Sequence, residues 1–364
     1  MWFYCLILII ASLGVVTNLV NSKNAGEVVN LNIYPRGTFA IKLFIASIAL
    51  IIGLRHEVGG DWINYLPQLD IAFQFNFSES LLIGSDPAYS FLVWISAHSG
   101  LGIYGANLGC AFLFSIGLYY FVINNPKPWL ALSVAIPYLV IVVAMGYTRQ
   151  SAAIGFVMLG LVALQKNSLY KFIVWILIAS LFHKSAAILI PLAIFSGRKG
   201  WVAVLGVILI GVLLYILILS EHLGDLISGY IVQEYNSSGA AIRIAMNALP
   251  AVVFLMFKKR FNISKEQKLF WLWISIGSLI FIPILIFSPS STAVDRVALY
   301  WIPIQIFVWS RLPIALGQES GTRTQWTIVV LAYSFTVLIV WVLFADHSYA
   351  WVPYKFYPWV WLWS

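Results

Sequence analysis

Long apolar runs separated by short polar segments dominate this chain. A helix of about 20 apolar residues is long enough to cross the hydrocarbon core of a bilayer. We find no internal repeat and no linker that would separate a second domain. The pattern therefore predicts an all-α, polytopic integral membrane protein with a single transmembrane domain over residues 1–364. Full crossings are predicted near 1–20, 37–54, 103–123, 128–146, 149–165, 200–219, 241–257, 267–287, 294–310 and 325–344.

Two segments do not fit a simple crossing. The segment 169–196 is interrupted at His183-Lys184, so one long helix and a hairpin of two short helices both fit its length. The segment from Asp86 to Gly100 is too short to cross and predicts a re-entrant or interfacial half-helix. About ten full crossings and a hairpin give about 12 crossings in total.

Basic residues decide between these topologies, because they collect on the cytoplasmic side of membrane proteins. A single crossing at 169–196 would place Lys258-Lys259-Arg260 on the opposite side from Lys166 and Lys171. A hairpin with the N-terminus outside instead leaves most of the 21 basic residues inside. We therefore predict the hairpin. The basic residues left outside are Arg55, Arg149, Lys184, Arg243, Arg296 and Lys355, and the outer segments are 55–102, 220–240 and 345–364.

Composition narrows the class of protein further. Only 9% of residues are charged and 62% are hydrophobic, whereas a soluble domain carries about 25% charged residues. A soluble enzyme is thereby excluded. Cys5 and Cys110 both lie inside apolar runs, so no disulfide framework or cysteine metal site is predicted. The apolar run that begins at Met1 has no basic segment at its start and no A-x-A-like cleavage site, so we expect it to be the first helix and not a removed signal peptide.

The net charge of +8 could suit a nucleic acid, but in a membrane protein the basic residues report topology first. We therefore predict that the protein is embedded in a lipid bilayer and does not bind nucleic acid. Four of the six outer basic residues are arginines, whose rigid fork of donors suits phosphate oxygens. Each could simply pair with an outer acid or cap a helix. Convergence of all four favours an outward-facing pocket for an anionic, phosphorylated lipid.

The densest polar run extends from Arg55 to Tyr65 at the outer end of the second predicted helix. It contains His56, Glu57, two glycines and Asp61. Asp61 directly precedes Trp62-Ile63 and could therefore be a helix N-cap as readily as a functional carboxylate. Asp61, Asn64 and Tyr65 have helical spacing, which predicts a short amphipathic helix at the outer interface.

A series of short motifs runs along most of the chain. The motifs are Arg55 followed by Val58-Gly59-Gly60-Asp61-Trp62 and Asn64-Tyr65, then Asp86-Pro87, Arg149-Gln150, His183 within 179–186, Asp295-Arg296 with Tyr300, and Trp351-Val352-Pro353-Tyr354. Taken in this order, they resemble the EpsG/Wzy-type polysaccharide polymerase family. One departure is Gly60, which stands where such sequences more often carry threonine.

The resemblance implies a glycosyltransferase of the bacterial inner membrane with its site facing the periplasm. Such enzymes move a glycan from undecaprenyl pyrophosphate onto the non-reducing-end sugar of another lipid-linked unit. The lipid-linked oligosaccharide is then the substrate, and the sequence leaves open a co-polymerase that regulates chain length. A flippase for lipid-linked oligosaccharides and another outer-face transferase, such as an O-antigen ligase, are the alternatives. No Asp-x-Asp pair occurs, so we predict a metal-independent enzyme without a cofactor.

The expected roles follow from this chemistry. Pyrophosphate is a leaving group whose charge arginines can stabilise, and a sugar hydroxyl needs a general base. His183 and Asp61 are rival candidates for that base, and a core histidine bonded to a backbone carbonyl is the alternative for His183. The residues expected to bind pyrophosphate or sugar are Arg55, Arg149 and Arg296, then Arg243, with Glu57 to hold Arg55, and Gln150, Lys184, Tyr65 and Tyr300 around them. Asp295 could support Arg296 in the same way, although neighbours on a helix do not face one another and would engage third partners.

Aromatic residues near the helix ends have two interpretations. Tyr65, Tyr147, Tyr300 and Tyr354 could stack on sugar rings, but an interfacial aromatic belt also predicts tyrosine there and is favoured. The tail tryptophans at positions 351, 359, 361 and 363 are expected to anchor the chain at the interface for the same reason.

Overall fold

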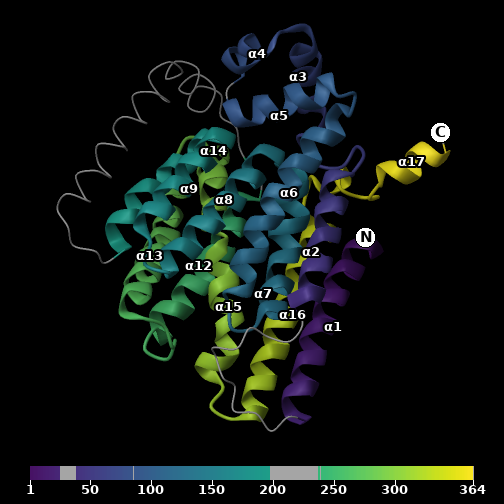
Figure 1. The fold of residues 1–364 in the computed structure, drawn as a ribbon. Helices are drawn as coiled ribbons and strands as arrows, with labels where there is room; N and C mark the ends of the chain where they lie inside the picture. The colour runs from purple at the N-terminus through teal and green to yellow at the C-terminus, as the bar shows by residue number, and fades with distance from the viewer. Residues whose placement is uncertain (25–37, 85, 197–236, 238, 364) are drawn as a thin grey trace.

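The computed structural model describes residues 1–24, 38–84, 86–196, 237 and 239–363. Within these residues every regular element is a helix, which confirms the predicted all-α fold (Figure 1). The predicted crossing at 200–219 and most of the outer segment 220–240 lie outside the described residues. Five described helices are long and apolar enough to cross a membrane, as expected of a polytopic membrane protein.

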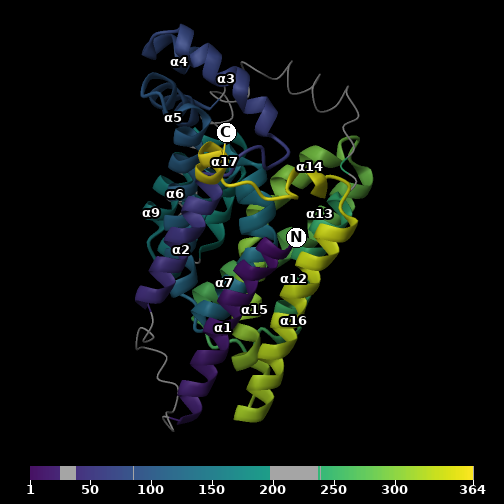
Figure 2. The same ribbon diagram turned by 90° about the vertical axis from the view of Figure 1, so that its right-hand side faces the viewer.

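Most predicted crossings begin and end within a few residues of an observed helix. The close agreement arises because the polar residues between the runs end each helix. The helices are α1 (Trp2–Asn24), α2 (Thr38–Gly53), α6 (Gly102–Ile123), α7 (Pro128–Ala135) with the π-helix η1 (Ile136–Ala144), α8 (Thr148–Gln165), α12 (Ala240–Phe257), α13 (Lys265–Phe287) and α16 (Ser320–Phe344). Figure 2 shows α1 and α16 running along one face of the bundle.

Three short helices form a layer at one end of the bundle (Figure 1). They are α3 (Trp62–Gln74), α4 (Phe77–Ile83) and α5 (Pro87–His98). The predicted half-helix after Asp86 is α5, and α3 is the predicted short helix after Asp61. A capping box between Asn76 and Glu79 begins α4. This layer brings Asp61 and Asp86 to the same end of the molecule.

The segment 169–196 forms the predicted hairpin. Helix α9 (Leu169–Phe182) ends at His183, whose backbone is extended, and the 3₁₀ helix η2 (Lys184–Ser196) packs back against α9. His183 therefore lies at the tip of the hairpin. That tip is at the end of the bundle that carries α5.

The predicted crossing at 294–310 is formed by a bent pair of helices. The chain there forms α14 (Ser291–Ala298), η4 (Leu299–Trp301) and α15 (Pro303–Leu316), with a bend of 44° between the two halves. Pro303 has no backbone N–H to donate to the preceding turn, so the helix breaks at its first position. The break leaves Asp295, Arg296 and Tyr300 on the short piece that precedes the bend.

The C-terminal segment folds back over the C-terminal end of α2. Arg55 pairs with Phe356 through an isolated β-bridge, and the N–H of His56 donates to the carbonyl of Lys355 at 2.9 Å. Trp351 is only 2% exposed, and its indole N–H donates to the carbonyl of Ile141. The expectation that Trp351 anchors the chain at the membrane interface is therefore wrong, because its ring is buried in the protein. Trp359 and Trp361 remain exposed.

Helices α6 and α8 pack closely at the centre of the bundle. A Cβ atom added to Gly117 would lie 2.0 Å from the carbonyl oxygen of Gly155, and one added to Gly155 would lie 2.7 Å from the Cα of Phe114. Small residues permit this approach between membrane helices, where packing supplies most of the association energy. The position of α8, which carries Arg149, thus depends on two glycines.

Gly117→Ala should lower the thermal unfolding midpoint of the purified protein, because the added methyl group overpacks a backbone contact. Overpacking costs about 1–3 kcal/mol. Gly321→Ala is the matched control, since nothing lies within 4 Å of a Cβ at that helical position. Unfolding followed by tryptophan fluorescence checks both variants. Equal midpoints for the two would contradict the close packing of α6 on α8.

Candidate functional site

The carboxylate of Asp86 joins three segments of the chain. Its Oδ2 accepts a hydrogen bond from Nη1 of Arg149 at 2.8 Å and lies 3.8 Å from Nδ1 of His183. Its Oδ1 accepts from the backbone N–H of Lys184 at 3.2 Å. Asp86 is 3% exposed and immediately precedes α5, yet its side chain does not cap that helix. The start of α8 and the hairpin tip therefore meet at one buried carboxylate.

The electrostatics of this cluster keep Asp86 ionised. Burial acts to raise the pKa of the Asp86 carboxyl, but the hydrogen bond and charge of His183 and the charge of Arg149 outweigh it, and the pKa is lowered. A carboxylate beside an imidazole can hold the ring in one orientation. Asp86 and His183 thus lie side by side, with the guanidinium of Arg149 next to them.

A second ion pair lies nearby. Nη1 of Arg296 is 3.6 Å from Oδ2 of Asp61, and its guanidinium lies 3.9 Å from the ring centre of Tyr147. Both charged side chains are partly exposed, at 29% for Arg296 and 23% for Asp61. Asp61 precedes α3 but makes no capping hydrogen bond, so the helix-cap interpretation of this residue is wrong. Its carboxylate faces a cation instead.

Neutral side chains connect the two ion pairs. The ring centre of Tyr65 lies 5.9 Å from Cζ of Arg149. The pKa of the Tyr65 hydroxyl is raised, mainly by burial and then by the charge of Asp61, while Arg149 and Arg296 act to lower it. Gln150, next to Arg149 on α8, donates its side-chain N–H to the carbonyl of Arg296 at 2.5 Å. Both ion pairs therefore belong to one site.

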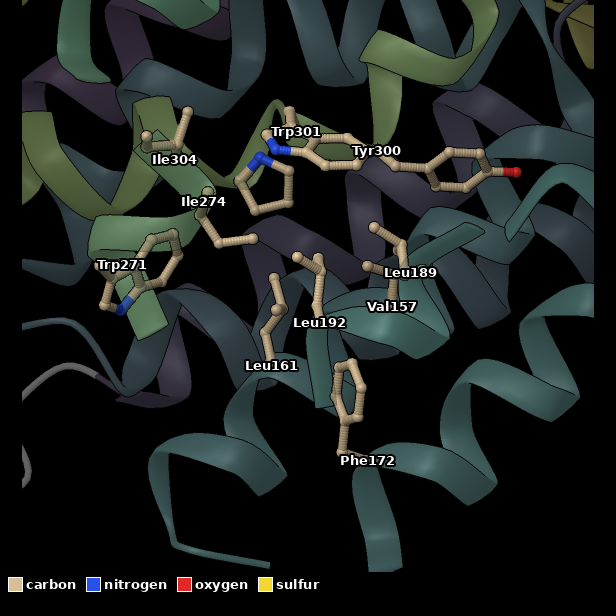
Figure 3. A pocket seen from close by; sticks show the side chains of 11 residues that line it. Val157, Leu161, Phe172, Leu189, Leu192, Trp271, Ile274, Tyr300, Trp301 and Ile304 are labelled. Carbon is tan, nitrogen blue, oxygen red and sulfur yellow. The ribbon is translucent and has the colours of Figure 1, made fainter. Parts of the chain in front are cut away.

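Tyr300 approaches the same site from η4. Its hydroxyl lies 3.1 Å from Oγ of Ser185, just after the hairpin tip. Figure 3 shows the Tyr300 hydroxyl directed away from an apolar cluster that includes Trp271, Trp301 and Phe172. Tyr65 and Tyr300 are 3% and 2% exposed, so they line the protein interior and not an interfacial belt. The apolar cluster holds Tyr300 in place beneath the site.

Arg55 is placed differently from the other arginines. It is 1% exposed, and its guanidinium donates to the carbonyls of Val58 and Ile52 and to the side chains of Asn107 and Thr148. The guanidinium therefore donates four hydrogen bonds to other groups of the protein. This placement favours a role in positioning the 52–58 turn and the start of α8 over the direct phosphate contact expected from sequence.

One expected pair does not form. Glu57 accepts from Nζ of Lys355 at 2.6 Å and does not contact Arg55, because the arginine points into the protein. The expectation that Glu57 holds Arg55 is therefore wrong. Asp295 and Arg296 are neighbours on a helix and face apart, and Asp295 engages a third residue by pairing with Nε of Arg243 at 2.5 Å. Arg243 is thereby drawn toward the site from α12.

A cavity of about 260 Å³ opens beside the Asp86 cluster. Arg149 and Asp86 lie on one wall, and α3 and α5 form the others. A phosphate or sugar group in this space would meet the Arg149 guanidinium directly. The remaining lining residues are Gln68, Ile71, Ala72, Ser80, Gly84, Tyr89, Ser90 and Val93.

Asp86-Pro87 is one of the motifs in the sequence, but Asp86 was not among the predicted site residues. The available signal was an acid directly before the proline that begins a helix, a pattern that capping alone also explains. Asn107 and Thr148, which hold Arg55, carried no such signal within their apolar runs. Among the residues that the structure describes, no three His, Cys, Asp or Glu side chains gather as a metal-ion site.

Asp86→Asn should destabilise the protein at about pH 7, because it leaves Arg149 and His183 without their anion. Leaving a buried hydrogen-bonding group without its partner costs about 1–3 kcal/mol, and more when the group is charged. The Asp86 pKa is lowered on folding, so this contribution is present above the ordinary aspartate value of 3.8 and is lost as the pH falls through the lowered pKa. The gap in unfolding midpoint between wild type and variant should therefore shrink on acidification.

Glu57→Gln is the control, because it removes a carboxylate from an exposed pair. Surface pairs contribute about 0–1 kcal/mol, so its effect at neutral pH should be small. If the difference in unfolding midpoint between wild type and Asp86→Asn is small, or does not change with pH, the Asp86 cluster does not stabilise the fold.

Comparison with protein families matches the chain to the EpsG family over residues 39–356. The matched range runs from the start of α2 to Phe356, the residue that pairs with Arg55, and includes both ion pairs of the site. No curated protein and no solved structure matches the chain. The matched range covers most of the sequence and carries every charged residue of the site. The chain therefore belongs to the EpsG family, the family of EpsG-type polysaccharide polymerases.

Proposed function

We propose that this protein polymerises lipid-linked glycan repeat units at the outer face of the bacterial inner membrane. Membership of the EpsG family supports a membrane protein of the polysaccharide polymerase type. The observation that carries the finer proposal is the meeting of Asp86, Arg149 and His183 beside a cavity. This arrangement supports the proposal, because a cation suited to a departing phosphate and a side chain able to act as a base lie close together there.

The proposed reaction joins an acceptor sugar to a donor glycan. A hydroxyl oxygen at the non-reducing end of one lipid-linked unit attacks the anomeric carbon of the donor glycan. The bond from that carbon to the pyrophosphate oxygen breaks, and undecaprenyl pyrophosphate leaves with the electron pair. The hydroxyl proton passes to a base in the site. The products are the longer lipid-linked glycan and the free carrier.

His183 is the base in this proposal, because the Asp86 carboxylate lies 3.8 Å from its Nδ1 and can orient the ring beside the cavity. Asp61 is the rival, but its carboxylate lies 3.6 Å from Nη1 of Arg296 and faces that cation. We assign Asp61 to orienting Arg296. The backbone N–H of Lys184 donates to Asp86. Lys184 directly follows His183 in the sequence, so its side chain is a further cation at the hairpin tip.

Arg149 and Arg296 stabilise the charge that develops on the pyrophosphate. A preorganised cation in a site of low dielectric stabilises a developing anion far more than it would in water. Arg149 is the second residue of α8, so the positive end of the helix dipole adds to its charge. Gln150 fixes the backbone of Arg296, and Arg55 fixes the start of α8. Arg243 acts through Asp295 and has no direct role in this proposal.

The charge distribution supports an outer site. The turn between α12 and α13 contains Lys258, Lys259 and Arg260 and lies at the end of the bundle opposite α3, α4 and α5 (Figure 1). The positive-inside rule assigns that basic turn to the cytoplasm. The two ion pairs of the site then face the outside.

Reconstitution of the purified protein with lipid-linked repeat units and a metal chelator should yield glycans longer than one unit. The expected product is a ladder on a gel, with release of undecaprenyl pyrophosphate in step with each bond. The chelator is included because both cations of the proposed site are side chains. Transport of the lipid-linked units across the vesicle membrane without any longer product would instead identify a flippase and overturn the proposal.

A further inference from the structure

A second cavity, of about 250 Å³, lies apart from the Asp86 cluster. It is bounded by η1, α12, α16 and the residues that follow α16. Its wall is mostly apolar and aromatic, including Tyr138, Val142, Met246, Val337 and Trp341. We call this cavity the lateral groove. Such a lining suits a hydrocarbon and offers little to a sugar.

Exposed apolar side chains border the lateral groove. Ile242 on α12 is 59% exposed, and Val340 and Phe344 on α16 are 38% and 75% exposed. Both helices have the length and composition of membrane spans, so we expect their exposed apolar side chains to face lipid. In a bilayer the groove would then open sideways toward lipid, between these two helices.

The other end of the lateral groove reaches the candidate site. Tyr147 lines the groove and also lies under the guanidinium of Arg296 at 3.9 Å from ring centre to Cζ. Arg243 lines the groove and pairs with Asp295, the neighbour of Arg296. The apolar lining thus ends near two cations, Arg243 and Arg296, while Asp346 and His347 complete its polar part.

Trp351 gives this end of the groove a fixed shape. Its indole N–H donates to the carbonyl of Ile141, and its ring packs on Gly146, where an added Cβ would lie 2.4 Å from the indole. Because Trp351 is 2% exposed, it is part of the protein wall and not a mobile surface group. A wall built in this way suits a specific occupant.

We propose that the lateral groove holds the hydrocarbon chain of the lipid-linked diphosphate substrate, at the part of the chain next to its head group. This inference rests on the proposed function and adds the path by which the substrate enters. A molecule with its chain in the groove has its diphosphate at Arg296, and the rest of the chain continues into the bilayer. An ordinary phospholipid could fill the apolar part, but the cations at the inner end favour a diphosphate.

A matched pair of variants on α16 tests the inference. Val340 lines the lateral groove, whereas Ile339 is the next residue, is 48% exposed and does not line it. Val340→Trp should fill the groove and raise KM for a long-chain substrate by about tenfold, because each buried methylene contributes to binding. Ile339→Trp should leave KM unchanged. With a substrate whose prenyl chain is cut to two isoprene units, the two variants should differ far less.

Each outcome separates this inference from the proposed function. Polymerisation by wild type with equal KM for the two variants would overturn the groove and leave the function intact. No polymerisation by wild type would overturn the function itself. If Val340→Trp fails to fold, photo-crosslinking of wild type with a diazirine-bearing polyprenyl diphosphate decides the matter. Labelling of Met246 or Val337 that excess polyprenyl diphosphate prevents supports the groove. The inference is overturned if excess phospholipid prevents the labelling equally well, or if the label attaches elsewhere in the protein.

Discussion

The arrangement of the site depends on one buried carboxylate, that of Asp86. Burying a charge is costly unless a partner and hydrogen bonds compensate for it, and Arg149, His183 and the N–H of Lys184 supply that compensation together. The three partners come from the start of α8 and the tip of a helical hairpin. Asp86 thus specifies how these elements meet, because any other arrangement would leave charges unpaired in a poorly hydrated place.

Arg55 imposes a second constraint, on the turn that leads to Asp61. Its buried guanidinium joins the carbonyls of Ile52 and Val58 to Thr148 at the start of α8. Gly59 follows with a φ of +108°, and a Cβ there would lie 2.3 Å from the carbonyl of Met145. Only glycine tolerates both conditions. The turn is therefore pressed against the bundle, and Asp61 emerges from it toward Arg296.

The sequence predicted the helices well because long apolar runs leave little choice of structure in a bilayer. It also placed His183 at a hairpin tip, since a single crossing there would have separated the basic clusters. Pairing was harder to predict. Glu57 was expected to hold Arg55, but whether an arginine points outward or inward depends on distant partners such as Asn107 and Thr148.

The same limit applies to aromatic residues. Tyr65, Tyr300 and Trp351 have the sequence positions of an interfacial belt but are buried within the protein. Only the packing of α3, η4 and the C-terminal segment onto the bundle distinguishes the two cases. Asp86 was missed for a related reason: an acid before Pro87 reads as a helix cap until the structure shows its side chain turned away. The local sequence pattern predicts the helices, whereas contacts between residues far apart in the sequence determine which side chains form the site.

A double-mutant cycle on polymerisation between Asp86 and His183 tests the central claim most directly. If Asp86 acts by orienting and stabilising the His183 ring, each of Asp86→Asn and His183→Gln alone should lower kcat by about 10²-fold or more, the range typical of a lost general base. The double variant should then be little worse than either one. Multiplication of the two losses in the double variant would show that the residues act independently and would contradict the account.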